Sequence, residues 1–459
     1  MSIGAVVGLE AAAVIVRPAP HLVDPGPIGR AIRDAVKAQP DDPIGAFYRA
    51  HGFRPLWLDG QAFRPEAWRL IDALRRSDGD DLDPEVYHPA QLAAQIAQAG
   101  ADPARLADAE LALSRAYAAF ARDLHQPAPS AGLQFVDPAI SMPPTQPAAI
   151  LADAARASSL AEALDSAQRM NPIYLRLREA LAARRAHGDL GPRTRRIEVN
   201  LERARGLPVD LGQRYVLVDP AMARLWLYSD GRPKGTMRVV VGKRSLPTPS
   251  MIGLIRFALL NPYWNVPPDL VRDRIAPAVL IRGPAYLRQH HFEALSDWSQ
   301  APVSLNPDSV DWRAVAEGEQ ALRVRQSPGP DNMMGRIKFM LPNPLGVYLH
   351  DTSEPHLFHD VTRTDSSGCV RVEHPGWLAE WLFDRPFRLT RAGAPDQRED
   401  LPAPTPVYIL YLTAFPSDRG LVYPPDIYGR DSPLETELEA MPNRDAARAQ
   451  QPVSETLGV

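Results

Sequence analysis

The hydrophobic periodicity of this 459-residue chain changes near Gly206, and no single class of secondary structure fits both sides of that change. Before it, apolar residues recur at the spacing of amphipathic helices. After it, β-branched and aromatic residues gather in short runs typical of strands. The chain is therefore expected to be an α+β multidomain protein, with helices first and a sheet second. Its length agrees, since one hydrophobic core rarely serves more than about 250–300 residues.

Helix start and stop signals mark the N-terminal half as a helical scaffold. Asp102 is placed to cap one long helix, and Asn171 and Pro172 open another that Gly188 can close. Between these helices, residues 126–147 are rich in proline, which excludes a helix or a central strand. We find no residue pattern in this half that points to chemistry.

Strand signals begin near residue 212. Asp230 and Gly231 predict a tight hairpin turn, so the first strands should be antiparallel. The runs expected to form strands are 215–219, 223–231, 235–243, 255–267, 335–343, 346–350, 387–391 and 406–415.

These patterns predict five segments. The N-terminal segment is residues 1–42, the helical scaffold domain residues 43–211, and the mainly antiparallel β domain residues 212–430. Within that domain, residues 267–336 are irregular and charged, and we expect them to form an inserted capping or lid subdomain. Residues 431–459 are expected to be a disordered tail.

Composition narrows the classes of function and the location. The formal net charge of −4 gives no basis for nucleic-acid binding. One cysteine cannot form an internal disulfide, so redox compartment stays open. Residues 1–16 are apolar but carry Glu10 and no basic residue, which fits either the remnant of an export signal or an ordinary N-terminus. No later run is long and apolar enough for a membrane span.

The stretch from 347 to 375 concentrates reactive side chains, including the single cysteine. Strand alternation puts Cys369 and Arg371 on one face, while Val370 and Val372 can fill a core on the other. A thiolate is a strong nucleophile, and a nearby cation can lower the pKa of its thiol. The plain alternative is that a lone cysteine is a small buried apolar residue.

A second strand end supplies a candidate base. Alternation in residues 346–350 puts Tyr348 and His350 on one face, with His350 at the end of the strand. Gly368 has no Cβ, so a substrate carbonyl can approach the backbone there, where the amides around Cys369 can line an oxyanion hole.

A metal site is the competing interpretation of the same stretch. Nitrogen and sulfur ligands for zinc are offered by His350, His356, His359, Cys369 and His374. The spacing disfavours it, since there is no His-Glu-x-x-His helix and no pair of close cysteines. We expect no metal and no other cofactor.

His350, a variable loop over residues 351–365, and Ser-Ser-Gly-Cys-Val-Arg at 366–371 together resemble the signature of the L,D-transpeptidase (YkuD) catalytic domain. Further stretches resemble the large multidomain subgroup that carries a helical scaffold domain. Ser367 stands where many members have a second histidine. Residues 187–208 leave no room for the peptidoglycan-binding module that many relatives carry.

The resemblance implies a peptidoglycan L,D-transpeptidase, an acyltransferase of cell-wall biosynthesis and cell shape that forms 3-3 cross-links and is a carbapenem target. Cys369 would be the nucleophile and His350 the base, with Gly368, Ser367 and Tyr348 lining the substrate site. Arg371 would either hold a substrate carboxylate or orient the loop. The partners would be peptidoglycan stem peptides and cell-wall synthesis proteins, and the location periplasmic. L,D-carboxypeptidase activity, attachment of a protein to the wall, a zinc-dependent hydrolase and a non-catalytic wall-binding scaffold remain alternatives.

Overall fold

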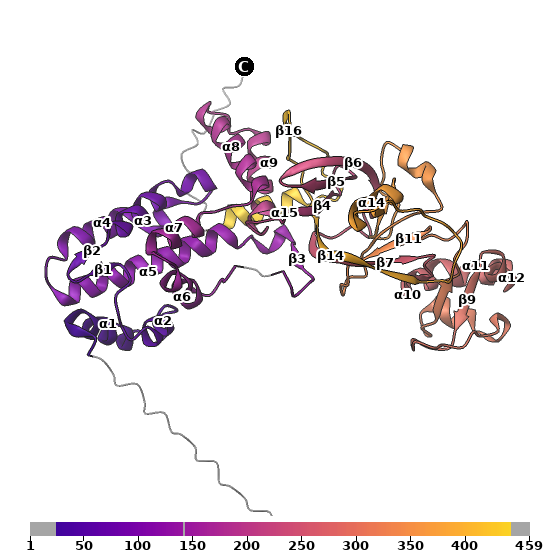
Figure 1. The fold of residues 1–459 in the computed structure, drawn as a ribbon, viewed down its shortest axis with the longest axis horizontal. Coiled ribbons are helices and arrows are strands. Elements are labelled where there is room, and N and C mark those ends of the chain that lie inside the picture. Colours follow the sequence, from indigo (N-terminus) through magenta and orange to yellow (C-terminus); the bar gives the residue numbers. More distant parts are fainter. Residues whose placement is uncertain (1–23, 141–142, 442–459) are drawn as a thin grey trace, which may run out of the picture. The chain divides into compact units, whose positions relative to one another are not determined.

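The computed structural model describes residues 24–140 and 143–441, and these residues divide into two compact units (Figure 1). Among the described residues, the first unit is built from 24–75, 87–122 and 144–166. The second takes 76–86, 123–140, 143 and 167–441. The chain therefore passes between the units several times, where the sequence suggested one scaffold followed by one β domain.

The first unit is helical. The Ala104 N–H donates to Asp102 Oδ1 at 2.9 Å, so Asp102 supports the first turn of the longest helix as expected. Leu106, Leu113 and Phe120 on that helix are buried. The elements are α1 (Gly26–Ala38), α2 (Gly45–Ala50), α3 (Pro65–Arg75), α4 (Pro89–Gln98), α5 (Pro103–His125), α6 (Pro147–Arg156), α7 (Leu160–Ala167) and a small sheet of β1 (Leu58–Asp59) and β2 (Ala62–Phe63).

Two further helices, α8 (Pro172–Ala186) and α9 (Pro192–Arg205), belong to the second unit. The Asn171 side chain caps α8 by accepting from the Tyr174 N–H at 2.9 Å, and its amide donates to Ala204 O of α9 at 2.9 Å. The two helices share an apolar cluster with Ala414, beyond the last strand of the main sheet. Their packing explains why they fall with the sheet and outside the expected scaffold.

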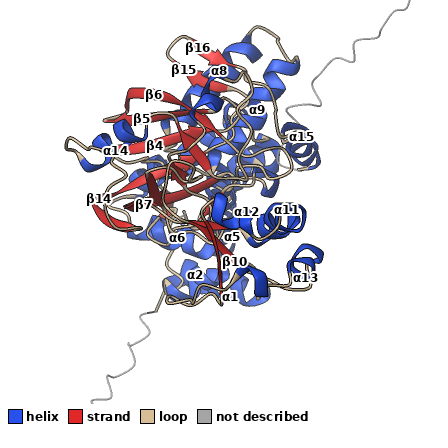
Figure 2. Cartoon of the chain, turned by 90° about the vertical axis from the view of Figure 1, so that its right-hand side faces the viewer, coloured by secondary structure: helices blue, strands red, loops and turns tan. Residues whose placement is uncertain are grey.

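The main sheet of the second unit has nine strands, and most neighbouring pairs are antiparallel. Its order is β11-β12-β13-β6-β5-β4-β14-β7-β3, and part of this order is visible from β6 to β7 in Figure 2. The bounds are β3 (Gln134–Phe135), β4 (Arg214–Asp219), β5 (Arg224–Ser229), β6 (Arg232–Val240), β7 (Met251–Leu260), β11 (Ile337–Met340), β12 (Leu349–His350), β13 (Val370–Val372) and β14 (Gln397–Ile409).

An additional pairing between β11, at one end of this order, and β7, next to the other end, closes eight of the strands into a ring. Asp230 and Gly231 both have positive φ, 53° and 69°, which is the geometry of the tight hairpin predicted between β5 and β6. Strand β3 adds to β7 as a parallel neighbour, so the proline-rich connection contributes only a short strand at the margin.

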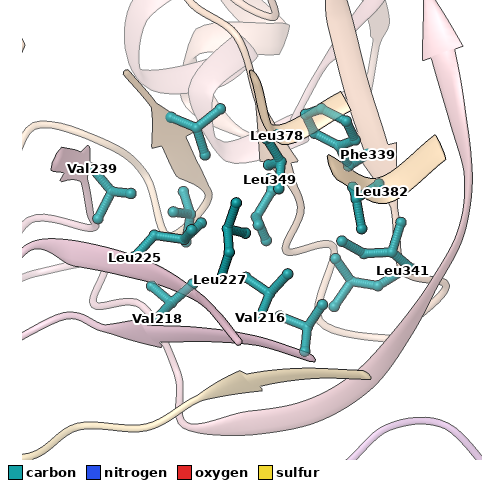
Figure 3. Close-up of a cluster of buried hydrophobic side chains, with 14 of the residues drawn as sticks. Val216, Val218, Leu225, Leu227, Val239, Phe339, Leu341, Leu349, Leu378 and Leu382 are labelled. Carbon is teal, nitrogen blue, oxygen red and sulfur yellow. The ribbon is translucent and has the colours of Figure 1, made fainter. Parts of the chain in front are cut away.

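One face of these strands buries the main hydrophobic core (Figure 3). The strands contribute alternate residues, and the helix α14 (Pro375–Phe383) closes the cluster with Leu378 and Leu382. Core members labelled in Figure 3 are Val216, Val218, Leu225, Leu227, Val239, Phe339, Leu341, Leu349, Leu378 and Leu382.

The insertion is a subdomain with its own sheet and core, between β7 and β11. Its three strands are ordered β8-β10-β9, and residues such as Val266, Ala276 and Val324 fill a separate apolar cluster. The elements are β8 (Trp264–Val266), α10 (Pro268–Leu270), a π-helical turn (Val271–Ile275), α11 (Ala276–Arg282), α12 (Ala285–Gln289), β9 (Phe292–Leu295), α13 (Trp312–Glu317) and β10 (Arg323–Gln326). The inserted subdomain therefore begins at Trp264, slightly before the expected residue 267.

Three details differ from the sequence predictions. Helix α1 lies in the segment 1–42, for which the sequence predicts no helix, and residues 387–391 form no strand. Helix α15 (Asp431–Ala440) replaces the first part of the expected tail, because Leu434 and Leu438 are buried. Arg203 of α9 pairs with Asp431 at 2.7 Å. The remainder of that tail, 442–459, and the apolar residues 1–16 lie outside the described residues.

The β domain also ends in a two-stranded ribbon of β15 (Phe415–Ser417) and β16 (Gly420–Val422). Among the described helices, none combines the length and the apolar character needed to cross a membrane.

Candidate active site

Two parallel strands of the ring bring the predicted nucleophile and base to one face. In the β12–β13 ladder His350 is the register partner of Arg371, and Cys369 comes two residues before Arg371. Val370 and Leu349 point into the core with no exposed surface. Because side chains alternate along a strand, Cys369, Arg371 and His350 all lie on the opposite face. The predicted alternation is confirmed for both strands.

His350 is held as a neutral imidazole with one nitrogen free to accept a proton. Its Nδ1 lies 2.5 Å from the carbonyl oxygen of Asp351, and since a carbonyl can only accept, Nδ1 carries the hydrogen. Nε2 therefore keeps its lone pair. Burial lowers the pKa of His350 to about 3, and the positive charges of Arg371 and Lys338 add to this effect. The side chain is 2% exposed, more enclosed than a strand end suggested.

Cys369 is half-buried, and its sulfur contacts the backbone of the β11–β12 connection at Gly346 and Tyr348. The thiol donates to Gly346 O at 3.5 Å. Burial raises the pKa of the Cys369 thiol, while the Tyr348 backbone N–H, Lys338 and Arg371 act in the opposite direction. With the pKa of Cys369 raised and that of His350 lowered, the resting site holds a neutral thiol and a neutral imidazole.

The backbone before the cysteine is fixed by two buried hydroxyl groups. Ser366 Oγ donates to Cys369 O at 2.5 Å and accepts from the Gly368 N–H at 3.2 Å. Thr248 Oγ1 donates to Gly368 O at 2.9 Å and accepts from the Gly242 N–H at the same distance. Gly368 has φ +107°, which disfavours any residue with a side chain. The sharp turn that presents the thiol is thus held from both sides.

A second layer supports Thr248 itself. Tyr428 Oη donates to Gly242 O at 2.7 Å and accepts from the Thr248 N–H at 3.3 Å, while Arg430 donates to Thr248 O at 3.1 Å. Both side chains follow the end of the sheet, so the C-terminal residues before α15 help to position the cysteine loop.

Arg371 and the remaining predicted site residues have distinct environments. Arg371 Nη1 donates to Glu354 Oε2 at 2.6 Å, which ties the strand to the loop over residues 351–365. Tyr348 is partly buried on the Cys369 face, and burial raises the pKa of its hydroxyl. Ser367 is exposed beside the thiol. Arg371 was expected either to hold a substrate carboxylate or to orient the loop. The contact with Glu354 fits the second role.

Comparisons with known protein families match two parts of the chain. A family described as the L,D-transpeptidase catalytic domain (YkuD) matches residues 213–409, and one described as a scaffold domain matches residues 42–181. The chain carries an L,D-transpeptidase catalytic domain. The α+β organisation expected from the sequence, with helices before a β-rich catalytic domain, is confirmed.

Similar proteins include a curated Haemophilus influenzae protein named "Putative L,D-transpeptidase", 32% identical over 250 residues. The match covers 52% of this chain and 48% of that protein, so the chain spans about half the length of the relative it matches. Two solved structures are similar over 45% of this chain. One is the avibactam carbamoyl enzyme of Ldtfm, at 15% identity over 51% of that chain with TM-score 0.22. The other is a cysteine-to-serine mutant of the Enterococcus faecium L,D-transpeptidase, at 14% over 52% with TM-score 0.19.

The L,D-transpeptidase domain has three site residues that the sequence did not reveal. Ser366 and Thr248 fix the backbone before Cys369 through their hydroxyl groups. Serine and threonine are common on protein surfaces, so the residue type alone does not indicate this role. Lys338 on β11 is the register partner of His350 and lies over the ring of Tyr348. Strand alternation in residues 335–343 is enough to predict that Lys338 lies on the outer face of the strand. Its place in the site depends on the pairing of β11 with β12, which the sequence does not show.

The other histidines of residues 347–375 lie on neither β12 nor β13. His356 and His359 lie on a short 3₁₀ turn within the loop, and His374 is exposed at the start of α14. Within the described part of the L,D-transpeptidase domain, no three histidine, cysteine, aspartate or glutamate side chains are arranged to hold a metal ion.

Proposed function

We propose that the protein is a peptidoglycan L,D-transpeptidase that forms 3-3 cross-links through a thioester on Cys369. The observation that carries this proposal is the β12–β13 ladder, which puts the thiol and an imidazole with a free Nε2 on one face. The match of residues 213–409 to the L,D-transpeptidase catalytic domain supports the same chemistry. A thiol beside a neutral base is the arrangement that nucleophilic acyl transfer requires.

In the first half-reaction the sulfur of Cys369 attacks the carbonyl at the L-centre of diaminopimelate in a tetrapeptide stem. His350 Nε2 takes the thiol proton as the carbon–sulfur bond forms. The tetrahedral intermediate then breaks its carbon–nitrogen bond, and His350 returns the proton to the leaving D-alanine amine. The product is a thioester on the enzyme.

In the second half-reaction the side-chain amine of a second stem attacks the thioester. His350 accepts a proton from that amine, the carbon–sulfur bond breaks, and the proton passes to the departing sulfur. The new amide is the 3-3 cross-link, and the free thiol is restored. Attack by water in place of the amine would give the carboxypeptidase product.

The backbone around the cysteine is suited to stabilise the intermediate. We propose the N–H groups of Gly368 and Cys369 as oxyanion donors. The Gly368 N–H already donates to Ser366 Oγ at 3.2 Å, so a substrate oxygen would share or replace that long bond. Arg371, paired with Glu354, would orient the loop, and Tyr348 and Ser367 would line the substrate site.

This function places the protein outside the inner membrane. Its substrate is the wall, so we propose a periplasmic location, with stem peptides and cell-wall synthesis proteins as partners. A nucleic-acid partner has no role in this chemistry.

Intact-mass spectrometry after exposure to a carbapenem tests the proposal. A competent nucleophile should gain one covalent adduct, and Cys369→Ala should gain none while its circular dichroism matches the parent. Ser432→Ala, a change at an exposed residue of α15, serves as the control and should still be acylated. Cross-linking by the Cys369→Ala variant would refute the thioester mechanism.

The same acyl-enzyme could serve different products. Incubation with purified tetrapeptide muropeptides, followed by chromatography, measures 3-3 dimers against released tripeptides. Dimers as the main product support transpeptidation, whereas tripeptides alone would assign the chain as an L,D-carboxypeptidase. Attachment to a protein would instead need a lysine-bearing acceptor in the assay.

A further inference from the structure

The outer face of the active-site strands carries a lysine that neither the signature nor the acyl-transfer steps use. Lys338 lies on β11, between Ile337 and Phe339, which point into the core with no exposed surface. It is the antiparallel register partner of His350. Its Nζ lies 3.6 Å from the centre of the Tyr348 ring, so the ammonium is on the same face as the thiol.

The ammonium of Lys338 has no counter-ion of its own. Across residues 24–140 and 143–441, no carboxylate oxygen lies within 4.0 Å of Nζ. Two arginines near it are paired, Arg371 with Glu354 at 2.6 Å and Arg336 with Asp351 at 2.8 Å.

Its surroundings favour the binding of an anion. Burial lowers the pKa of Lys338, and the negative charges that Cys369 and Asp396 can carry act in the opposite direction. Asp396 already accepts from the Tyr263 N–H at 3.0 Å and lies beyond ion-pair distance of Lys338. A partly desolvated ammonium without a partner is costly, so a carboxylate arriving there would be bound favourably.

The proposed reaction brings such a group to this position. The residue expelled from the donor is the last of the stem, so its carboxylate lies about one residue, roughly 3.3–3.6 Å of chain, beyond the carbonyl that Cys369 attacks. Cys369 is close enough to Lys338 for its charge to act on the lysine. The Tyr348 ring beneath Nζ belongs to the residue whose backbone N–H acts on the Cys369 thiol, so this cation lies on the part of the site that would receive the end of the stem.

We propose that Lys338 binds the free C-terminal carboxylate of the donor stem, and so makes the site select stems that end one residue after the attacked carbonyl. This inference rests on the proposed transpeptidase function. Stems with a further residue, or with an amidated C-terminus, would place no negative charge at Nζ.

The test compares two donors that differ only in that charge: a tetrapeptide stem with a free C-terminal carboxylate and the same stem as its carboxamide. Single-turnover acylation of Cys369 is followed by intact mass over a range of donor concentrations. A hydrogen bond to a charged group is worth about 1.5–3 kcal/mol, so the parent should prefer the carboxylate by about 10–150-fold. Lys338→Met should lose that preference through slower reaction with the carboxylate alone, and Lys338→Arg should keep most of it.

The carboxamide donor is the internal control for folding, because its rate should be the same in the parent and in Lys338→Met. Arg398→Gln removes a cation that already pairs with Asp400 at 2.6 Å on β14, and it should leave the preference unchanged. The assignment would be wrong if Lys338→Met slowed acylation equally with both donors, or if this variant kept the preference for the carboxylate donor.

A neutral thiol reagent separates this role from an effect on the sulfur. If Lys338→Met shifts the pH dependence of iodoacetamide alkylation and leaves the donor preference intact, the lysine tunes the thiol and the carboxylate proposal is wrong. If the parent is alkylated by iodoacetamide but acylated by neither stem, the transpeptidase function itself fails, and the inference fails with it.

Discussion

The hydroxyl of Thr248 should be worth several kcal/mol to the cysteine loop, which Thr248→Val can test. Valine keeps the shape of threonine and removes the oxygen that joins the Gly242 N–H to the Gly368 carbonyl, both at 2.9 Å. Thr248 has no exposed surface, so water is not available to replace it. Each buried polar group left unpaired costs about 1–3 kcal/mol, which makes about 2–6 kcal/mol for the two.

Urea unfolding of the full chain, followed by the fluorescence of its tryptophans, measures this cost. Thr248→Ser keeps the hydroxyl and should recover most of the loss. Thr405→Val is a matched control, since the Thr405 hydroxyl is also buried but makes only a 3.5 Å contact with Ala403 O. A Thr248→Val variant within about 0.5 kcal/mol of the parent, the range usual for neutral surface changes, would refute the reasoning.

Three further results are expected. His350→Ala should fold and acylate about 10²–10⁴-fold more slowly, as measured by carbapenem adduct formation, whereas an unchanged rate would move the base elsewhere. The pKa of His350 is about 3 in the folded state and about 6.5 when unfolded, so the unfolded state takes up the proton first as pH falls. Stability should therefore drop from about pH 6.5 toward 3, and less steeply in His350→Gln; equal slopes in urea titrations would argue against a buried neutral imidazole. Trp264 and Gln326 are register partners, so residues 265–325 can be replaced by an Asn-Gly turn. If the insertion is a lid that excludes water, Cys369 should still be acylated while tripeptide release rises relative to cross-links; a parallel fall of both products would count against the lid.

Local chemistry made much of the fold predictable. The caps at Asp102 and Asn171, the turn at Asp230 and Gly231 and the alternation around Cys369 depend on residues close in sequence. Residue propensities and hydrophobic periodicity therefore predict these features from the sequence alone.

The features that could not be predicted depend on contacts between distant segments. Lys338 reaches the site through the register of β11 against β12, and Arg371 is engaged by Glu354 from the loop. The 387–391 run has strand-forming residues but finds no neighbour, so the absence of pairing overrides its propensity. Helix α15 could not be predicted because its sequence is mostly polar. Its two buried residues, Leu434 and Leu438, pack against residues distant in the sequence.

The closed ring has a consequence for the timing of synthesis. Its first strand, β4, pairs on one side with β14, which is the last strand of the ring to be made. At about 5–20 residues per second a ribosome needs about 10–40 s to make the chain between Arg214 and Ile409. During that interval β4 and β7 both lack a neighbour, so a nascent or prematurely terminated chain presents two open strand edges to other chains. Messages truncated before residue 397 should therefore yield aggregates or degraded protein, and no partly active fragment.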